Sequence, residues 1–172
     1  WIHCYASPET MPLITTLSFY RFLGTRNILW ALRQNQSALR PLSRVEGLRF
    51  YKLMGSGSEG YSTYPDWKVY AILQVWESRE AAKAYFESHP LASRYERRSE
   101  NQWRLYLKLT RARGSWGGGN PFGEAQSGGE LPDETTASPI AVLTRATIRK
   151  RHLLRFWRYV PYSQRPLSQA RG

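Results

Sequence analysis

The chain contains little cysteine and little histidine. Its one cysteine, Cys4, excludes a disulfide framework and any zinc or iron–sulfur site built from several cysteines. Such cysteine usage fits a reducing compartment, so we expect a cytoplasmic location. The three histidines, His3, His89 and His152, are scattered, and no pair has the spacing of a helical metal site. A histidine-based hydrolase is therefore a poor fit.

Several other signals are missing. No run of about 18 apolar residues occurs, so we expect no membrane-spanning helix. The chain has no Gly-x-Ser-x-Gly elbow, and Gly55–Gly60 only partly matches a dinucleotide loop because the residues after it do not open a helix. The chain begins at Trp1, without a basic leader before an apolar core, which predicts a trimmed start rather than a secretory signal.

Positive charge is abundant and unevenly spread. Lysine and arginine number 25 against 13 acidic residues, giving a net charge of +12. Residues 145–172 hold eight cationic residues and no acidic one. Such a segment suits a phosphate backbone, an anionic lipid surface or an acidic partner, and it equally suits a solvated helix face.

Hydrophobic periodicity predicts a mixed α+β domain. Strands are predicted over 13–20, 48–54, 67–76 and 102–109, and helices over 26–39, 79–88 and 91–99. After an irregular segment 1–12, this order is the βαββαβ pattern of a ferredoxin-like unit covering 13–110. Gly55–Gly60 is predicted to be the connection between two strands.

Individual positions sharpen this prediction. The segment Trp67–Trp76 is apolar on both faces, which is typical of a central strand covered on both sides. In Gln102–Leu109 we expect Trp103, Leu105 and Leu107 to point inward and Arg104 outward. Ser78 is a candidate helix N-cap, and His89 stands at a helix break before Pro90.

A second unit is predicted to begin near the end of the chain. A glycine-rich linker over 111–138 is followed, in 139–172, by a predicted strand Ile140–Ile148 and a basic helix His152–Tyr159. Trp30 and Trp157 occupy equivalent places in the two strand–helix segments, which indicates the start of a second ferredoxin-like repeat. A lone unit would expose an apolar sheet face, so a homodimer is expected.

Aromatic residues make up 14% of the chain and are compatible with two kinds of function. They could stack on bases or line a pocket for an extended apolar ligand. No predicted strand carries the aromatic pattern of an RNA-recognition domain, so an RNA or polyanion-binding module rests on charge alone. That module is the alternative to an enzyme.

Four separated motifs resemble one known family. They are Ile14–Phe22 (ITTLSFYRF), Phe50–Gly57 (FYKLMGSG), Val69–Leu73 with Trp76, and Ile140–Arg149 (IAVLTRATIR) followed by Phe156, Trp157, Val160 and Pro161. Together they are similar to the spheroidene monooxygenase family, which are bacterial carotenoid ketolases. The resemblance covers about residues 13–161.

The resemblance implies an activity and an architecture. It implies an enzyme that uses molecular oxygen, is reported to contain haem, and introduces a keto group at C-2 of acyclic carotenoids. It also implies a tandem arrangement of the dimeric α/β-barrel type. Members of the family continue beyond the second strand–helix segment, so a fragment, or a non-catalytic haem- or pigment-binding relative, is a further reading.

The resemblance also suggests site residues for haem. Arg145 and Arg149 could meet the propionates, although a structural ion pair or a solvent-facing strand is an alternative. Gly55 and Gly57 could let backbone approach the cofactor, or simply make a tight strand connection. His152 and His89 are the axial-ligand candidates, each also readable as a surface or capping residue. No motif identifies the electron donor.

The resemblance bears on partners as well. A carotenoid partitions into membranes, so the enzyme must visit a bilayer surface, and the basic end would favour an anionic one. We therefore expect a cytoplasmic protein with peripheral contact to an inner or photosynthetic membrane. Nucleic acid is not expected as a partner.

Overall fold

The structure is a computed structural model in which 13–57, 65–109, 112, 116, 119–122, 141–143, 149–152, 155, 156 and 158 are described. The chain divides into two compact units. One comprises 1–56 and 67–137, and the other comprises 57–66 and 138–172.

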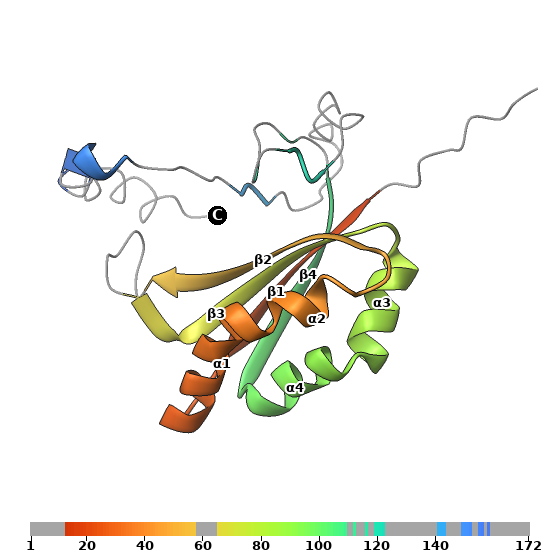
Figure 1. Ribbon diagram of the computed structural model, residues 1–172, viewed down its shortest axis with the longest axis horizontal. Coiled ribbons are helices and arrows are strands. Elements are labelled where there is room, and N and C mark those ends of the chain that lie inside the picture. The colour runs from red at the N-terminus through yellow and green to blue at the C-terminus, as the bar shows by residue number, and fades with distance from the viewer. Residues whose placement is uncertain are drawn as a thin grey trace, which may run out of the picture. The chain divides into compact units, whose positions relative to one another are not determined.

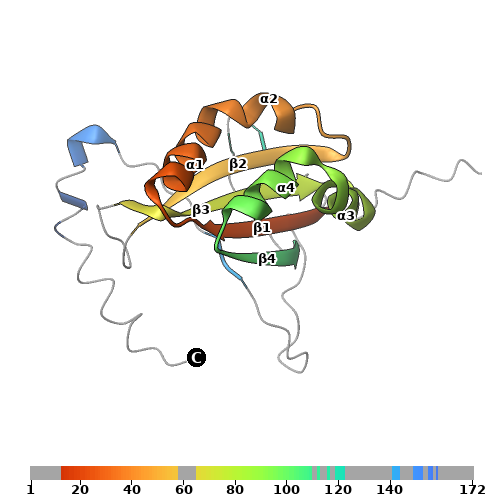
Figure 2. The same ribbon diagram turned by 90° about the horizontal axis from the view of Figure 1, so that it is seen from below.

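One four-stranded sheet, covered by helices, organises the first unit. The elements are β1 (Ile14–Arg21), α1 (Thr25–Ser37), α2 (Leu39–Leu42), β2 (Leu48–Gly57), β3 (Pro65–Trp76), α3 (Arg79–Ser88), α4 (Pro90–Arg98) and β4 (Asn101–Lys108). The strand order is β2-β3-β1-β4, with β1 antiparallel to both β3 and β4. The four helices lie on one face of the sheet (Figures 1 and 2). This topology is ferredoxin-like and confirms the predicted fold class.

Capping residues set the helix boundaries in the second half of the unit. The Ser78 hydroxyl accepts a hydrogen bond from the Ala81 backbone N–H at 3.1 Å, as predicted for a helix N-cap. Proline lacks the N–H that would extend α3, and Pro90 instead occupies the first turn of α4. His89, between the two helices, caps α4.

A glycine makes the turn into β2. Gly47 has φ 72°, and a Cβ placed there would lie 2.6 Å from the Cβ of Ala81. Both the left-handed conformation and the close approach therefore require glycine. The Gly47 carbonyl also accepts the Glu77 N–H at 2.9 Å, which joins this turn to the end of β3.

The core lies between the sheet and the helices. Its largest fully buried side chains include Trp76, Tyr20 and Phe22. They pack against aromatic and aliphatic side chains of α3 and α4, namely Tyr85, Phe86, Leu91 and Tyr95. Burying each large side chain contributes about 1.5–3 kcal/mol. The sequence did not show whether the aromatic residues form the core or contact a ligand. This aromatic layer shows that part of them form the core.

The face of the sheet away from the helices is apolar. The strand registers place side chains in rows, Ala71–Phe19–Trp103, Leu73–Leu17–Leu105 and Val75–Thr15–Leu107. Leu73 and Val75 on the central β3 are buried, whereas Trp103 on the β4 edge is 62% exposed. The prediction that 67–76 forms a central strand is confirmed, with β3 buried on both faces from Tyr70 to Trp76.

The predicted orientation of β4 is wrong. Trp103, Leu105 and Leu107 lie on the face away from the helices, and Arg104 points toward them. Alternation separates the two faces of a strand but does not say which face the helices cover. The charge of Arg104 is stabilised on the covered face because Glu96 of α4 forms an ion pair with it.

Other elements differ from expectation in extent. α2 was not predicted because it contains Pro41, which is tolerated there since the first-turn N–H groups need no helical partner. β2 continues through Gly55, Ser56 and Gly57, because pairing with β3 overrides the weak strand preference of glycine.

The predicted second repeat falls mostly outside the described residues. Ala141, Val142 and Leu143 lie in no strand, contrary to the prediction for Ile140–Ile148. A strand needs a hydrogen-bonded neighbour, and none is formed there by the residues that the structure describes. Lys150–His152 forms a 3-10 turn, and Arg155, Phe156 and Arg158 are helical within the predicted helix His152–Tyr159.

Candidate functional site

A cavity of about 580 Å³ lies along the edge strand β2. Its lining comes from β2 and from the junction of α1 and α2: Asn35, Leu39, Arg49, Phe50, Tyr51, Lys52, Leu53 and Gly55. Ligand pockets typically measure about 300–1,000 Å³, so this cavity can hold a small molecule or one end of a long one.

Both faces of β2 contribute to the cavity. Tyr51 and Leu53 pack against the core on the helix side. The Tyr51 hydroxyl donates to the Leu39 carbonyl at 2.9 Å, which fixes β2 against α2. Phe50 alternates to the other face and meets the Trp116 ring edge-on, with centroids 5.6 Å apart. The cavity therefore lies beside β2, an edge strand of the sheet.

The cavity combines apolar walls with a cationic rim. Leu39, Phe50, Tyr51 and Leu53 supply the apolar surface. Arg49 donates from Nε to Glu77 Oε1 at 3.1 Å in an exposed pair. Lys52 forms no ion pair with the residues that the structure describes. An apolar ligand with a polar or anionic end would match this distribution.

The side chains that line the cavity are apolar, amide, phenolic or cationic. None of the lining side chains is a histidine, cysteine, aspartate or glutamate. In the described part of the chain, no group of three such side chains could hold a metal ion.

The structure places the predicted site residues in different parts of the chain. Gly55 lines the cavity, and a Cβ added there would meet nothing within 4 Å, so its backbone is open to a ligand. Gly57 ends β2 and belongs to the second unit. Arg149 is exposed, and its carbonyl accepts the His152 N–H at 2.8 Å, so these two meet in one turn. Arg145 lies outside the described residues.

Neither described histidine presents a free lone pair to iron. The Nδ1 atom of His89 accepts the Leu91 N–H at 3.2 Å, and the Nε2 atom of His152 accepts from Arg151 Nε at 3.0 Å. A neutral imidazole has one acceptor nitrogen, and a metal ligand must use it. Burial, and then the charge of Arg94, lower the pKa of His89 and keep it neutral. As the structure describes them, His89 and His152 therefore do not serve as axial haem ligands without a change in these hydrogen bonds.

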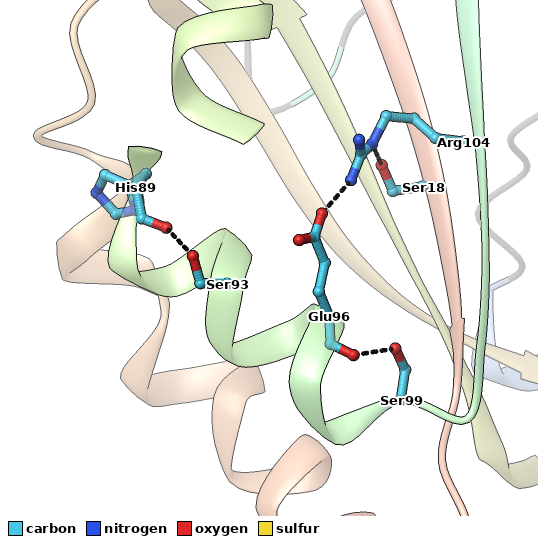
Figure 3. A network of polar contacts seen from close by, with 6 residues as sticks. All are labelled: Ser18, His89, Ser93, Glu96, Ser99 and Arg104. Carbon is cyan, nitrogen blue, oxygen red and sulfur yellow. Dashed lines mark hydrogen bonds and ion pairs between the residues drawn. The ribbon is translucent and has the colours of Figure 1, made fainter. Parts of the chain in front are cut away.

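A polar network crosses the core beside α4 (Figure 3). Arg104 donates from Nη2 to Glu96 at 3.0 Å and from Nε to the Ser18 hydroxyl at 3.3 Å. Its guanidinium centre lies 3.4 Å from the centroid of the Phe86 ring. This arrangement joins β1, β4, α3 and α4, and its partnered charges indicate a structural role.

Buried tyrosines surround the same network. Burial raises the pKa of Tyr20, opposed by the nearby Arg104. Burial also raises the pKa of Tyr85 and Tyr95. These phenols therefore remain protonated at neutral pH and serve as packing groups rather than as bases.

Sequence reasoning missed most of the cavity. It singled out Gly55 as a site residue, included Tyr51 and Lys52 only within the Phe50–Gly57 motif, and did not point to Asn35 or Arg49. The alternation of 48–54 predicted a strand, but no sequence signal showed that this strand is an edge with a helix end beside it. A matching of the predicted strand order to the ferredoxin-like pattern would have identified that edge.

The elements described above define the class: a ferredoxin-like α+β domain with a cavity along its edge strand. No family model matches the chain. It is 36% identical over 149 residues to the spheroidene monooxygenase of Rhodobacter capsulatus, covering 86% of this chain and 60% of that protein. It is 31% identical over 147 residues to the spheroidene monooxygenase of Cereibacter sphaeroides, covering 85% and 44%. These matches support membership of the chain in the spheroidene monooxygenase family.

The match covers only part of each relative's sequence. The chain spans about half the length of the curated relatives it matches, 60% of one and 44% of the other. Among solved structures, a cofactor-independent oxygenase from Streptomyces nogalater is 13% identical, with a TM-score of 0.42, over 62% of this chain and 98% of that chain. None of the helices that the structure describes is long and apolar enough to cross a membrane.

Proposed function

We propose that this chain acts as an oxygen-dependent monooxygenase, or as a fragment of one, that introduces a keto group at C-2 of an acyclic carotenoid. The observation that carries the proposal is the 36% identity to a spheroidene monooxygenase over 86% of the chain. The cavity along β2 supports it, because apolar walls are what a polyene end requires.

The cavity would receive one end of the substrate. A long polyene cannot enter a space of about 580 Å³ completely, so only its terminus would lie against Leu39, Phe50 and Leu53. Gly55 would leave room for the chain to pass along β2. Water displaced by the apolar end would favour binding by about 25 cal/mol per Å² of buried apolar surface.

The proposed reaction has a fixed balance. Conversion of a methylene to a ketone takes two oxygenation rounds. Each round consumes one dioxygen, two electrons and two protons, and it releases one water. The resulting gem-diol then loses water to give the ketone. A two-electron donor is therefore a required partner.

Haem dependence is a separate proposal, supported by the family resemblance alone. His89 and His152 do not offer a free lone pair, so haem would require a change in their hydrogen bonding or another ligand. Haem, when bound, would supply dioxygen activation. An absorption spectrum of the purified chain, before and after dithionite and carbon monoxide, tests this: a shifting Soret band supports haem, and its absence contradicts it.

A homodimer and peripheral contact with an anionic membrane are proposed as well. The apolar sheet face, with Trp103 62% exposed, supports pairing with a second copy. The cationic segment 145–172 supports the membrane contact.

Filling the cavity tests its role. Gly55→Trp puts a large side chain where a Cβ meets nothing within 4 Å, so folding should be preserved while the substrate is displaced. Ala84→Trp, on the exposed surface of α3, is the matched control. We expect spheroidene binding, measured by carotenoid absorbance, to fall at least about tenfold for the first variant and not for the second. Equal binding by both variants would contradict the assigned site.

A further inference from the structure

The outer face of α1 and α2 carries exposed leucines. Leu29 is 50% exposed and Leu32 is 40% exposed, although both lie in the middle of a helix. The inward side of α1 buries Ala31 and Gln34, so these leucines point away from the core. Leu23 before α1 and Leu39 at the start of α2 are exposed as well, at 42% and 38%.

The segment that carries these leucines is cationic. Between Phe22 and Val45 the sequence contains four arginines, Arg26, Arg33, Arg40 and Arg44, and no acidic residue. All four are exposed, and none pairs with a carboxylate among the residues that the structure describes. Arg98 of α4 adds a fifth positive charge, since it donates to Asn27 and lies over the Trp30 ring.

This helical face adjoins the β2 cavity. Leu39 belongs to both, because it is exposed on α2 and also lines the cavity. Asn35 of α1 lines the cavity from the same side. Figure 2 shows α1 and α2 together on the helical side of the sheet, above β2.

We propose that the outer face of α1 and α2 docks onto an anionic lipid bilayer, with Leu29, Leu32 and their neighbours entering the headgroup region and the arginines meeting lipid phosphates and carboxylates. Apolar side chains on a face rich in arginine and free of acidic residues are typical of an interfacial helix. The docking rests on exposure and charge. Its use, delivery of a membrane-dissolved polyene to the cavity beside Leu39, rests on the proposed function.

This assignment differs from the one based on the basic end of the chain. Residues 145–172 offer charge, whereas the α1–α2 face combines charge with exposed leucines. If only the charges of residues 145–172 bound the membrane, high salt would abolish the binding. Inserted leucines would preserve part of the membrane affinity in high salt.

Co-sedimentation of the full chain with vesicles tests the proposal. The vesicles are phosphatidylcholine with phosphatidylserine, or phosphatidylcholine alone. Leu29→Gln with Leu32→Gln should weaken binding to the anionic vesicles at least about tenfold. Arg26→Gln with Arg33→Gln should weaken it about 30-fold, at about fivefold per arginine.

Matched controls separate this face from general charge and hydrophobicity. Lys83→Gln with Arg97→Gln removes the same charge from exposed positions on α3 and α4. Val142→Gln removes an apolar side chain that is 84% exposed elsewhere. Both controls should bind vesicles nearly as the unmodified chain does, and circular dichroism confirms that every variant is folded.

Two results would overturn the proposal. The first is equal weakening by the control pair and the α1 arginine pair. The second is a leucine pair without effect, together with binding to a single-stranded RNA as tight as to vesicles, which would identify a general polyanion surface. Vesicle binding is measured without carotenoid or electron donor, so a failure of the proposed oxygenase activity leaves this test intact.

Discussion

The two faces of the sheet differ in how they mix polar and apolar side chains. The face covered by helices contains Thr16, Ser18, Gln74 and the Arg104–Glu96 pair among its aromatic side chains. The face without helices presents rows of leucine, valine, phenylalanine and tryptophan. Two of these polar side chains accept hydrogen bonds, since Trp76 donates to Thr16 at 2.9 Å and Arg104 donates to Ser18 at 3.3 Å.

The contrast agrees with the proposed pairing of the apolar face with a second copy. If this face were exposed to solvent, its side chains would be mostly polar, as they are on the solvated face of many antiparallel sheets. Here the exposure rises from Val75 on β3 to Trp103 on the β4 edge, from 0% to 62%. The helix-covered face should therefore determine stability, and the apolar face should determine assembly.

The largest expected effect is the loss of a core aromatic on the covered face. Trp76→Ala removes a fully buried indole and its hydrogen bond to Thr16, and should cost about 3–5 kcal/mol of the free energy of unfolding. Trp67→Ala, at a side chain that is 54% exposed on β3, is the control and should cost far less. Urea denaturation measures both, and equal losses would contradict the contrast.

The next effect concerns the charged pair under α4. Glu96→Gln leaves the half-buried Arg104 without its carboxylate and should cost about 1–3 kcal/mol. Glu77→Gln breaks the exposed pair with Arg49 and should cost about 0–1 kcal/mol. Thermal denaturation of the two variants should rank them in this order, and the reverse ranking would argue against a structural role of the network.

A smaller stability effect is expected on the apolar face. Trp103→Lys loses the stacked pair with Phe19, whose centroids lie 5.7 Å apart, which is worth about 0.5–1.5 kcal/mol. Its main effect should be on assembly, because a charge in the apolar face opposes pairing with a second copy. Sedimentation equilibrium should show a shift from dimer to monomer. An unmodified chain that is monomeric at all concentrations would contradict the proposed homodimer.

The smallest effect is a pH dependence at the α3–α4 junction. The pKa of His89 is lowered in the folded chain, first by burial and then by Arg94, so the unfolded chain binds the proton more readily. The stability from this group is complete above pH 6.5 and is lost as the pH falls through the lower folded value. Protonation also removes the acceptor that caps Leu91.

A substitution isolates that effect. His89→Asn retains a side-chain cap without a titrating group, so its unfolding midpoint should depend less on pH between about 5 and 7 than that of the unmodified chain. An identical pH dependence in the two chains would assign the effect to other groups.

The fold could be predicted from the sequence largely because its signals are local. Strand alternation, the Ser78 cap and the break at Pro90 depend on neighbouring residues, and each is found in the structure. The orientation of β4 and the extension of β2 through Gly55 and Gly57 depend on what packs or pairs with them, which no local pattern encodes. The cavity was missed for the same reason, since Asn35 and Lys52 meet only after folding.

The most direct test of the account is spheroidene turnover under labelled dioxygen. The unmodified chain and the Gly55→Trp variant are compared, with a two-electron donor present and the substrate in anionic vesicles. The account predicts a ketone carrying one oxygen-18 atom from the unmodified chain and a strongly reduced yield from the variant. An unlabelled ketone, or equal yields of labelled ketone from both proteins, would contradict an oxygenase acting at the β2 cavity.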